Sequence, residues 1–86
     1  MARYSVELSG HARRQIRALE RRTQDRIIAQ LEALTDDPRP AGAKKLAAPE
    51  PLWRIRIGDY RAVYKIEDDR LFLLVVNVGH RREVYR

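Results

Sequence analysis

The chain of 86 residues contains no cysteine, and this absence excludes disulfides, thiolate metal sites and cysteine nucleophiles. Two histidines are too few to indicate a zinc site unless carboxylates gather around them. The longest apolar run, residues 71–76, is too short to cross a membrane, and the N-terminus lacks the apolar core of a secretory signal. We therefore expect one cytoplasmic domain over residues 1–86, with no metal, no cofactor and no membrane partner.

Several catalytic motifs are also missing. The sequence has no phosphate-binding loop, no dinucleotide fingerprint and no HExxH zinc motif. Its acidic residues fall in expected turns or at helix ends, whereas two-metal nuclease chemistry needs clustered carboxylates. Any nuclease activity is therefore expected to proceed without a metal.

What the sequence has in excess is positive charge. Lysine and arginine number 18 against 12 acidic residues, which gives a net charge of +6. Most of the cations are arginines, and the guanidinium group binds phosphate oxygens in a bidentate manner. Nucleic acid is one partner that this charge favours, and an acidic protein is another.

Hydrophobic periodicity predicts a strand followed by two helices. Apolar residues alternate along residues 3–8, as in a half-buried strand. Ser9 is suited to cap a helix over residues 10–22, and Thr23 is suited to cap a second helix that ends near Leu34. The short link between the two predicts an antiparallel helical hairpin.

The rest of the chain predicts three strands. After a connection over residues 41–51, alternating apolar and basic residues flank the pair Gly58-Asp59, which is typical of a two-residue hairpin turn. A turn at Asp68-Asp69 leads to an apolar strand over residues 71–78, which Gly79 is expected to end. The expected fold is α+β, in the order β-α-α-β-β-β, with a small antiparallel sheet and the helical hairpin packed on one face.

The sequence leaves the register of the last strand open. A two-residue turn at Asp68-Asp69 would place Asn77 on the face that the helices cover. A longer loop or a β-bulge would place Asn77 beside the arginines of the other face.

One face of the predicted hairpin carries cations, namely Arg54, Arg56, Arg61 and Lys65. A turn at Gly58-Asp59 places Arg56 directly opposite Arg61. Like charges directly opposite each other destabilise a sheet, and a solvated surface is the simpler interpretation of these residues. A close pair of guanidinium groups is nevertheless suited to hold a phosphate.

The C-terminal segment VGHRREVYR offers a second group of functional side chains. The end of the last strand can bring His80 or Arg81 to the edge of the cationic face. Arg81 would then neutralise charge on a phosphate, Tyr85 would stack on a base and His80 would move a proton. The alternative is a polar terminus in which Tyr85 is only a hydrophobic anchor.

The first predicted helix is coated with arginines: Arg13, Arg14, Arg17, Arg21 and Arg22. Such a helix is usually a solvated surface. The alternative is a secondary docking surface for nucleic acid or an acidic protein.

Three segments in this order, KKL, WRIRIGDYRAVYKI and VGHRREVY, resemble the RelE branch of the RelE/ParE toxin superfamily. The resemblance covers nearly the whole chain and implies a toxin of a type II toxin–antitoxin system. RelE-type members are endoribonucleases that cut mRNA in the ribosomal A site and leave a 2′,3′-cyclic phosphate and a 5′-hydroxyl. The partners implied are a cognate antitoxin, the ribosome with its mRNA and, through the antitoxin, operator DNA.

The resemblance also assigns residues. The two basic strand positions of the family fall on Arg54 and Arg56, and the arginine of its GYR motif falls on Arg61. The arginine after VG falls on Arg81, and the terminal tyrosine falls on Tyr85, at a shorter spacing than in well-known members. The remaining basic residues expected to contact RNA are Lys44, Lys45, Lys65 and Arg82.

One departure from the family bears on the chemistry. Well-studied members have lysines at the positions of Arg54 and Arg56, and a lysine there is a candidate general base. A guanidinium group cannot be deprotonated in a protein. Either His80 is the base, or the site works by charge stabilisation while the ribosome aligns the 2′-hydroxyl.

Two other functions remain open at this point. ParE-type relatives share the fold and inhibit DNA gyrase, although they usually have a longer helical hairpin and lack the basic tail with its tyrosine. A third possibility is a non-catalytic member that acts only in a repressor complex with antitoxin and operator DNA.

Overall fold

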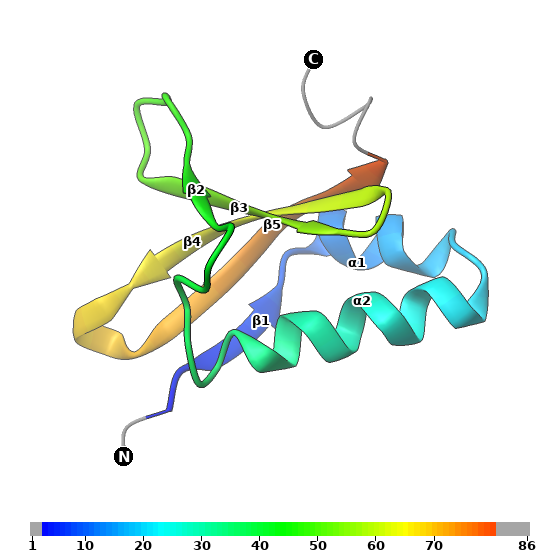
Figure 1. The fold of residues 1–86 in the computed structure, drawn as a ribbon, viewed down its shortest axis with the longest axis horizontal. Helices are drawn as coiled ribbons and strands as arrows, with labels where there is room; N and C mark the ends of the chain where they lie inside the picture. The colour runs from blue at the N-terminus through cyan, green and yellow to red at the C-terminus, as the bar shows by residue number, and fades with distance from the viewer. Residues whose placement is uncertain (1–2, 81–86) are drawn as a thin grey trace.

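Two helices pack on one face of a five-stranded sheet (Figure 1). The computed structural model describes residues 3–80. Along the chain, the elements are β1 (Ser5–Leu8), α1 (Gly10–Arg17), α2 (Arg21–Ala33), β2 (Lys44–Lys45), β3 (Leu52–Ile57), β4 (Tyr60–Glu67), the 3-10 turn η1 (Asp68–Arg70) and β5 (Phe72–His80). The α+β class and the predicted order are confirmed, and β2 is an additional short strand.

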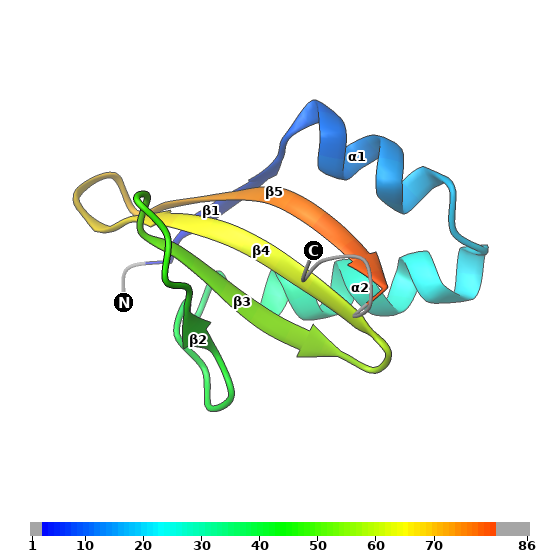
Figure 2. The same cartoon turned by 90° about the horizontal axis from the view of Figure 1, so that it is seen from above.

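The sheet is mixed, whereas the sequence predicts a wholly antiparallel one. Its strand order is β1-β5-β4-β3-β2, and β1 runs parallel to β5 while every other neighbouring pair is antiparallel. Parallel neighbours need a long crossover connection, and the two helices and three strands between β1 and β5 supply it. Figure 2 shows β5 lying between β1 and β4.

The predicted cap of the first helix is confirmed. Ser9 has an extended backbone, and its Oγ accepts a hydrogen bond from the amide of Ala12 at 3.0 Å. This bond satisfies one of the amides that a helix leaves unpaired in its first turn.

The link between the helices is longer than predicted. The first helix ends at Arg17 instead of residue 22, and the second begins at Arg21 with Glu20 as its N-cap in place of Thr23. The apolar pattern continues through Leu19, which is why periodicity alone places the boundary too late. The side-chain amide of Gln24 donates to the carbonyl of Leu19 at 2.7 Å, so it closes the turn after the first helix.

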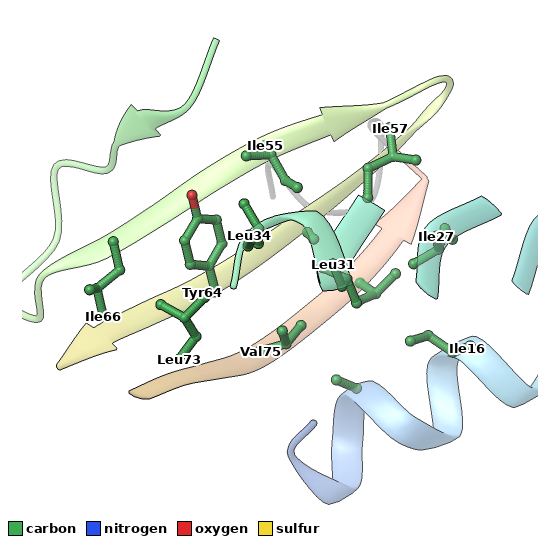
Figure 3. Close-up of a cluster of buried hydrophobic side chains, with 13 residues drawn as sticks. Ile16, Ile27, Leu31, Leu34, Ile55, Ile57, Tyr64, Ile66, Leu73 and Val75 are labelled. Atoms are coloured by element: carbon green, nitrogen blue, oxygen red, sulfur yellow. The ribbon is translucent and has the colours of Figure 1, made fainter. Parts of the chain in front are cut away.

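Figure 3 shows the core between the helices and the sheet. Ile27, Leu31 and Leu34 point from the second helix toward Tyr64 and Val75 of the sheet, and all five are buried. None of the helices among residues 3–80 is long and apolar enough to cross a membrane.

The last strand departs from its predicted course at both ends. It begins at Phe72, because Leu71 adopts a left-handed conformation with φ of 49° in the turn before it. It then continues through Gly79 to His80, although glycine was expected to end it. Gly79 pairs with Arg61 of β4. A glycine weakens a strand, but it does not interrupt the pairing here.

A β-bulge decides the register that the sequence leaves open. Tyr64 pairs with Val75 whereas Val63 pairs with Asn77, so Val76 is the extra residue. Asn77 therefore lies opposite Val63 on the face that carries the arginines, as the bulge alternative predicts.

Candidate functional site

The centre of the candidate site is a pair of arginines on neighbouring strands. Arg56 of β3 lies directly opposite Arg61 of β4, as predicted from the two-residue turn. In such a hairpin the pair next to the turn, Ile57 and Tyr60, is hydrogen-bonded, so the next pair is not. Side chains of a non-hydrogen-bonded pair are the closest that a sheet allows, with Cα atoms about 4.5 Å apart. The backbones of the two arginines thus approach each other as closely as cross-strand neighbours can.

Three further basic residues share this side of the sheet. Arg54 lies between Lys44 on β2 and Val63 on β4, and Lys65 lies one alternation beyond Val63. We define the cationic face as Lys44, Arg54, Arg56, Arg61 and Lys65. The helices cover the opposite side of the sheet. On the cationic face, Lys44 and Arg56 are exposed, whereas Arg54, Arg61 and Lys65 are half-buried.

The two central arginines have different surroundings. Arg56 is exposed, and its Nε donates to the carbonyl of Gly58 at 3.0 Å, so its side chain curls toward the hairpin turn. Arg61 is half-buried, and its Nε is buried. The Arg61 side chain therefore lies against the sheet, and the Arg56 side chain is held by the hairpin turn.

Two residues expected at the site lie on the other side of the sheet. Lys45 is opposite Trp53, whose side chain lies on the helix side. His80 is opposite Tyr60, and their rings make an edge-to-face contact with centroids 5.7 Å apart. The structure therefore does not bring the His80 imidazole together with Arg56 and Arg61. The physical reason is the strict alternation of side chains along β5.

Three predicted site residues, Arg81, Arg82 and Tyr85, lie outside the described residues. Within residues 3–80, no group of three or more histidines or carboxylates is placed to hold a metal ion.

A polar network anchors the connection that leads into β2. The guanidinium of Arg39 binds both carboxylate oxygens of Asp68, at 3.2 and 2.9 Å, and the hydroxyl of Tyr4 donates to the same carboxylate at 2.6 Å. Arg39 also lies over the ring of Trp53, 5.2 Å from its centroid. The connection is thus fastened to both β3 and the β4–β5 turn, and it places Lys44 at the edge of the cationic face.

The same contacts shift proton affinities. The hydrogen bond from Arg39, followed by that from Tyr4, lowers the pKa of Asp68 below its ordinary value. The Asp68 carboxylate in turn raises the pKa of Tyr4 and of Arg39. The network is therefore charged on the Arg39–Asp68 side and protonated at Tyr4 at neutral pH.

A cavity of about 590 Å³ opens beside the hairpin, between the end of α2 and β3. Gln30, Asp37, Arg56 and Gly58 contribute to its lining. A second cavity, of about 410 Å³, is lined on the helix side by residues that include Gln15, Tyr60 and His80; it does not open onto the paired arginines.

One basic residue lies near the site although no pattern in the sequence predicts its position there. Arg26 belongs to α2, and its guanidinium lies against Gly58 of the hairpin turn. The sequence shows only an arginine on an exposed helix surface, and nothing local indicates that this part of the helix faces the turn.

The described residues form a small basic α+β domain with two arginines paired between β3 and β4. A family model described as ParE toxin of type II toxin–antitoxin system, parDE, matches residues 6–85, and the chain belongs to this family. Its relatives of known structure include RelE toxins, so the chain is a type II toxin of the RelE/ParE superfamily. A comparison with curated proteins finds no match.

Three solved structures illustrate the similarity. A chain of the RelBE2 toxin–antitoxin complex from Mycobacterium tuberculosis is 26% identical, with 96% of this chain and 97% of that chain covered and a TM-score of 0.85. A mutant of the E. coli toxin RelE in the free state is 25% identical over 99% of this chain and 92% of that chain, with a TM-score of 0.79. A mutant RelE in complex with the antitoxin peptide RelBc is 26% identical over the same shares, with a TM-score of 0.75.

Proposed function

We propose that this toxin is a ribosome-dependent endoribonuclease that cuts mRNA in the A site without a metal. The observation that carries the proposal is the non-hydrogen-bonded pair of Arg56 and Arg61 at the centre of the cationic face. Close cations are unfavourable in the free protein and favourable once a phosphate lies between them. The similarity to RelE toxins at about 25% identity supports the same reaction class.

The chain's cations have complementary roles in this proposal. Arg61 and Arg56 hold the scissile phosphate, and Arg54, Lys44 and Lys65 bind the neighbouring phosphates. The family resemblance adds Arg81, which stabilises charge on the leaving oxygen, and Tyr85, which stacks on a base. Basic groups placed where charge develops lower the barrier to phosphoryl transfer because they need no reorganisation during the reaction.

The reaction is an in-line attack by the 2′-oxygen on the adjacent phosphorus. The bond to the 5′-oxygen breaks, and the products are a 2′,3′-cyclic phosphate and a 5′-hydroxyl. Neither arginine can accept the 2′-proton, and His80 lies on the other side of the sheet. We therefore assign the rate enhancement to charge stabilisation and alignment on the ribosome, with proton exchange through water.

Replacement of Arg61 by alanine tests this function. Cleavage of ribosome-bound message by the purified protein should fall on the order of 10²- to 10³-fold, the usual effect of removing one transition-state donor. Arg61→Lys should retain part of the rate, because it keeps the charge and loses the bidentate geometry.

Arg70→Ala is the matched control, since Arg70 is an exposed arginine that pairs with Glu67 at the far turn. It should cleave at the parent rate. Full cleavage by Arg61→Ala, with its thermal unfolding unchanged, would refute the assignment.

Inhibition of DNA gyrase is a second candidate, because the matching family model describes ParE toxins. Supercoiling by purified gyrase in the presence of the toxin separates the two functions. Inhibition of supercoiling together with intact ribosome-bound message would favour the ParE-type function. If the toxin neither cleaves ribosome-bound message nor inhibits supercoiling, the third candidate is favoured, namely a non-catalytic member that acts in a repressor complex.

We further propose that a cognate antitoxin covers the cationic face and that it links the toxin to operator DNA. RelE toxins of similar fold are found in complex with RelB antitoxins. Co-expression with the cognate antitoxin should relieve growth arrest and yield a stable complex.

A further inference from the structure

The hairpin turn carries a guanidinium group on its helix side. A Cβ built on Gly58 would lie 2.9 Å from Nη1 of Arg26 and 3.1 Å from both Cζ and Nη2. The Arg26 guanidinium therefore occupies the space that a side chain at position 58 would need. A residue larger than glycine would have to push this group aside.

A second guanidinium group contacts the same glycine. Arg56 Nε donates to the Gly58 carbonyl at 3.0 Å. The two arginines come from different elements, α2 and β3, so the turn joins the helix surface to the cationic face. The cavity beside the turn is lined by Gln30, Arg56 and Gly58.

That lining shows which stripe of the helix faces the turn. Gln30 lies four residues after Arg26, and Arg22 lies four residues before it, so all three share one side of α2. We define the tip cluster as Arg22, Arg26 and Arg56. All three are exposed.

The tip cluster differs in its charge balance from the four arginines of residues 3–80 that form ion pairs. Within residues 3–80, Arg3, Arg21, Arg39 and Arg70 each form an ion pair with a carboxylate. No ion pair of Arg22, Arg26 or Arg56 occurs in this part of the chain. The acidic residue at the turn is Asp59, which is exposed. The cluster therefore has a net positive charge and is complementary to a polyanion.

We propose that the tip cluster binds the phosphate backbone of the substrate RNA strand where it leaves the cationic face and passes around the β3–β4 turn. This inference rests on the proposed function, because it assumes that RNA occupies the cationic face. Arg26 is exposed and forms no ion pair within residues 3–80, so its guanidinium N–H groups can donate to phosphate oxygens. Arg22, one helical turn away, binds the next phosphate.

The test compares RNA of two lengths. The probes are a labelled 2′-O-methyl trinucleotide, which covers only the cationic face, and a 2′-O-methyl strand of about 12 nucleotides, which also reaches the tip. The double variant Arg22→Gln/Arg26→Gln should bind the long strand on the order of tenfold more weakly at low salt and the trinucleotide equally well. Its slope of log affinity against log salt should fall by about 1.4, because two phosphate contacts are lost.

A matched control comes from α1. Arg13 and Arg17 are also exposed arginines one helical turn apart, and α1 packs beside β1 and β5. The double variant Arg13→Gln/Arg17→Gln should bind both probes as the parent does. Since Arg26 contacts the turn, the thermal unfolding of each variant is measured as well. The single variant Arg22→Gln leaves that contact intact and should show about half of the decrease in salt slope.

Several outcomes would overturn the proposal. An equal loss of affinity for the long strand in the α1 control would mean that the effect is non-specific electrostatic attraction. Unchanged affinity for the long strand in the tip variant would mean that Arg22 and Arg26 do not contact the RNA. Weakened binding to empty ribosomes alone would identify ribosomal RNA, and weakened binding to polyglutamate alone would identify an acidic protein. The cleavage assay with Arg61→Ala is a separate experiment. If it refuted the ribonuclease function, the difference in binding between the long strand and the trinucleotide could still be measured.

Discussion

At the scale of single residues, Tyr64 couples stability to alkaline pH. Its side chain is fully buried, and its hydroxyl donates to the Pro38 carbonyl at 2.7 Å. Burial raises the pKa of Tyr64 from 10.0 to about 12. The folded protein therefore holds this proton more tightly than the unfolded chain does.

The stability that protonated Tyr64 contributes to the folded state is complete below pH 10.0, and it is lost as the pH rises toward about 12. We expect the free energy of unfolding, measured with urea, to decline through this interval. Tyr64→Phe should cost about 1 kcal/mol at neutral pH, because the Pro38 carbonyl loses its donor, and should show a flatter decline. An identical alkaline profile in the variant would exclude Tyr64 as the source.

Gly58 and Gly42 form a matched pair of glycines. Both have positive φ, 62° and 95°, but a Cβ at Gly42 would meet nothing within 4 Å whereas a Cβ at Gly58 would meet Arg26. Each alanine variant should lose about 1–2 kcal/mol through backbone strain. At Gly58 the Arg26 guanidinium must also move aside, and Arg26→Ala should remove this part of the loss in a double-mutant cycle measured by denaturation. Additive losses in the cycle would mean that Arg26 does not press on the turn.

Prediction from the sequence succeeded at the residue scale where the contact was local. The turn at Gly58-Asp59 fixes the register of the residues beside it, so Arg56 opposite Arg61 followed from counting. The contact of Arg26 with Gly58 joins distant segments, and no local pattern encodes it. His80 was expected near the arginines because the position of a strand end does not reveal which way its last side chain points.

At the scale of elements, Gln15 connects α1 to the part of β5 that extends beyond β1. Its Oε1 accepts from the Val78 amide at 2.6 Å, and its Nε2 donates to Asn77 Oδ1 at 2.7 Å. Gln15→Ala should cost about 1–3 kcal/mol, because it leaves a buried amide without a partner. Hydrogen exchange at Val78 should accelerate as well.

Gln30→Ala is the control for this change, since Gln30 is an exposed glutamine on α2. It should leave stability and the Val78 amide unaffected. Unchanged protection of Val78 in Gln15→Ala would show that this side chain does not seal the strand edge.

The elements themselves were predictable, and several of their limits were not. Alternation identified the strands, and Ser9 identified the start of the first helix. The end of that helix was missed because Leu19 continues the apolar spacing while the backbone already turns. The bulge at Val76, which sets the face of Asn77, depends on pairing with β4 and so lies beyond any pattern within β5.

At the scale of the whole molecule, the parallel pairing of β1 with β5 closes the fold. Tyr4, Val6 and Leu8 are partly buried and pack against the core. A chain that begins at Ser9 would lose them together with the edge hydrogen bonds of β5. Since a fully buried apolar side chain contributes about 1.5–3 kcal/mol and a small domain is only about 5–15 kcal/mol stable, we expect the truncated chain to lose cooperative thermal unfolding.

Removal of residues 1–2 alone should leave the melting transition unchanged, and circular dichroism would record both truncations. A sharp transition in the longer truncation would mean that the sheet does not need its first strand. The sequence predicted this strand but not its partner, because parallel pairing between distant segments leaves no short-range mark.

The neighbour of β1 in the sheet is β5, so the first of the described strands to leave the ribosome pairs with the last of them. Arg61 likewise lies in a strand flanked by β5. A nascent chain that stops before residue 72 therefore has neither a closed sheet nor a supported arginine pair. Synthesis that is interrupted before β5 yields fragments without an assembled sheet, so the surface that carries the arginine pair forms only after residues 72–80 have been made.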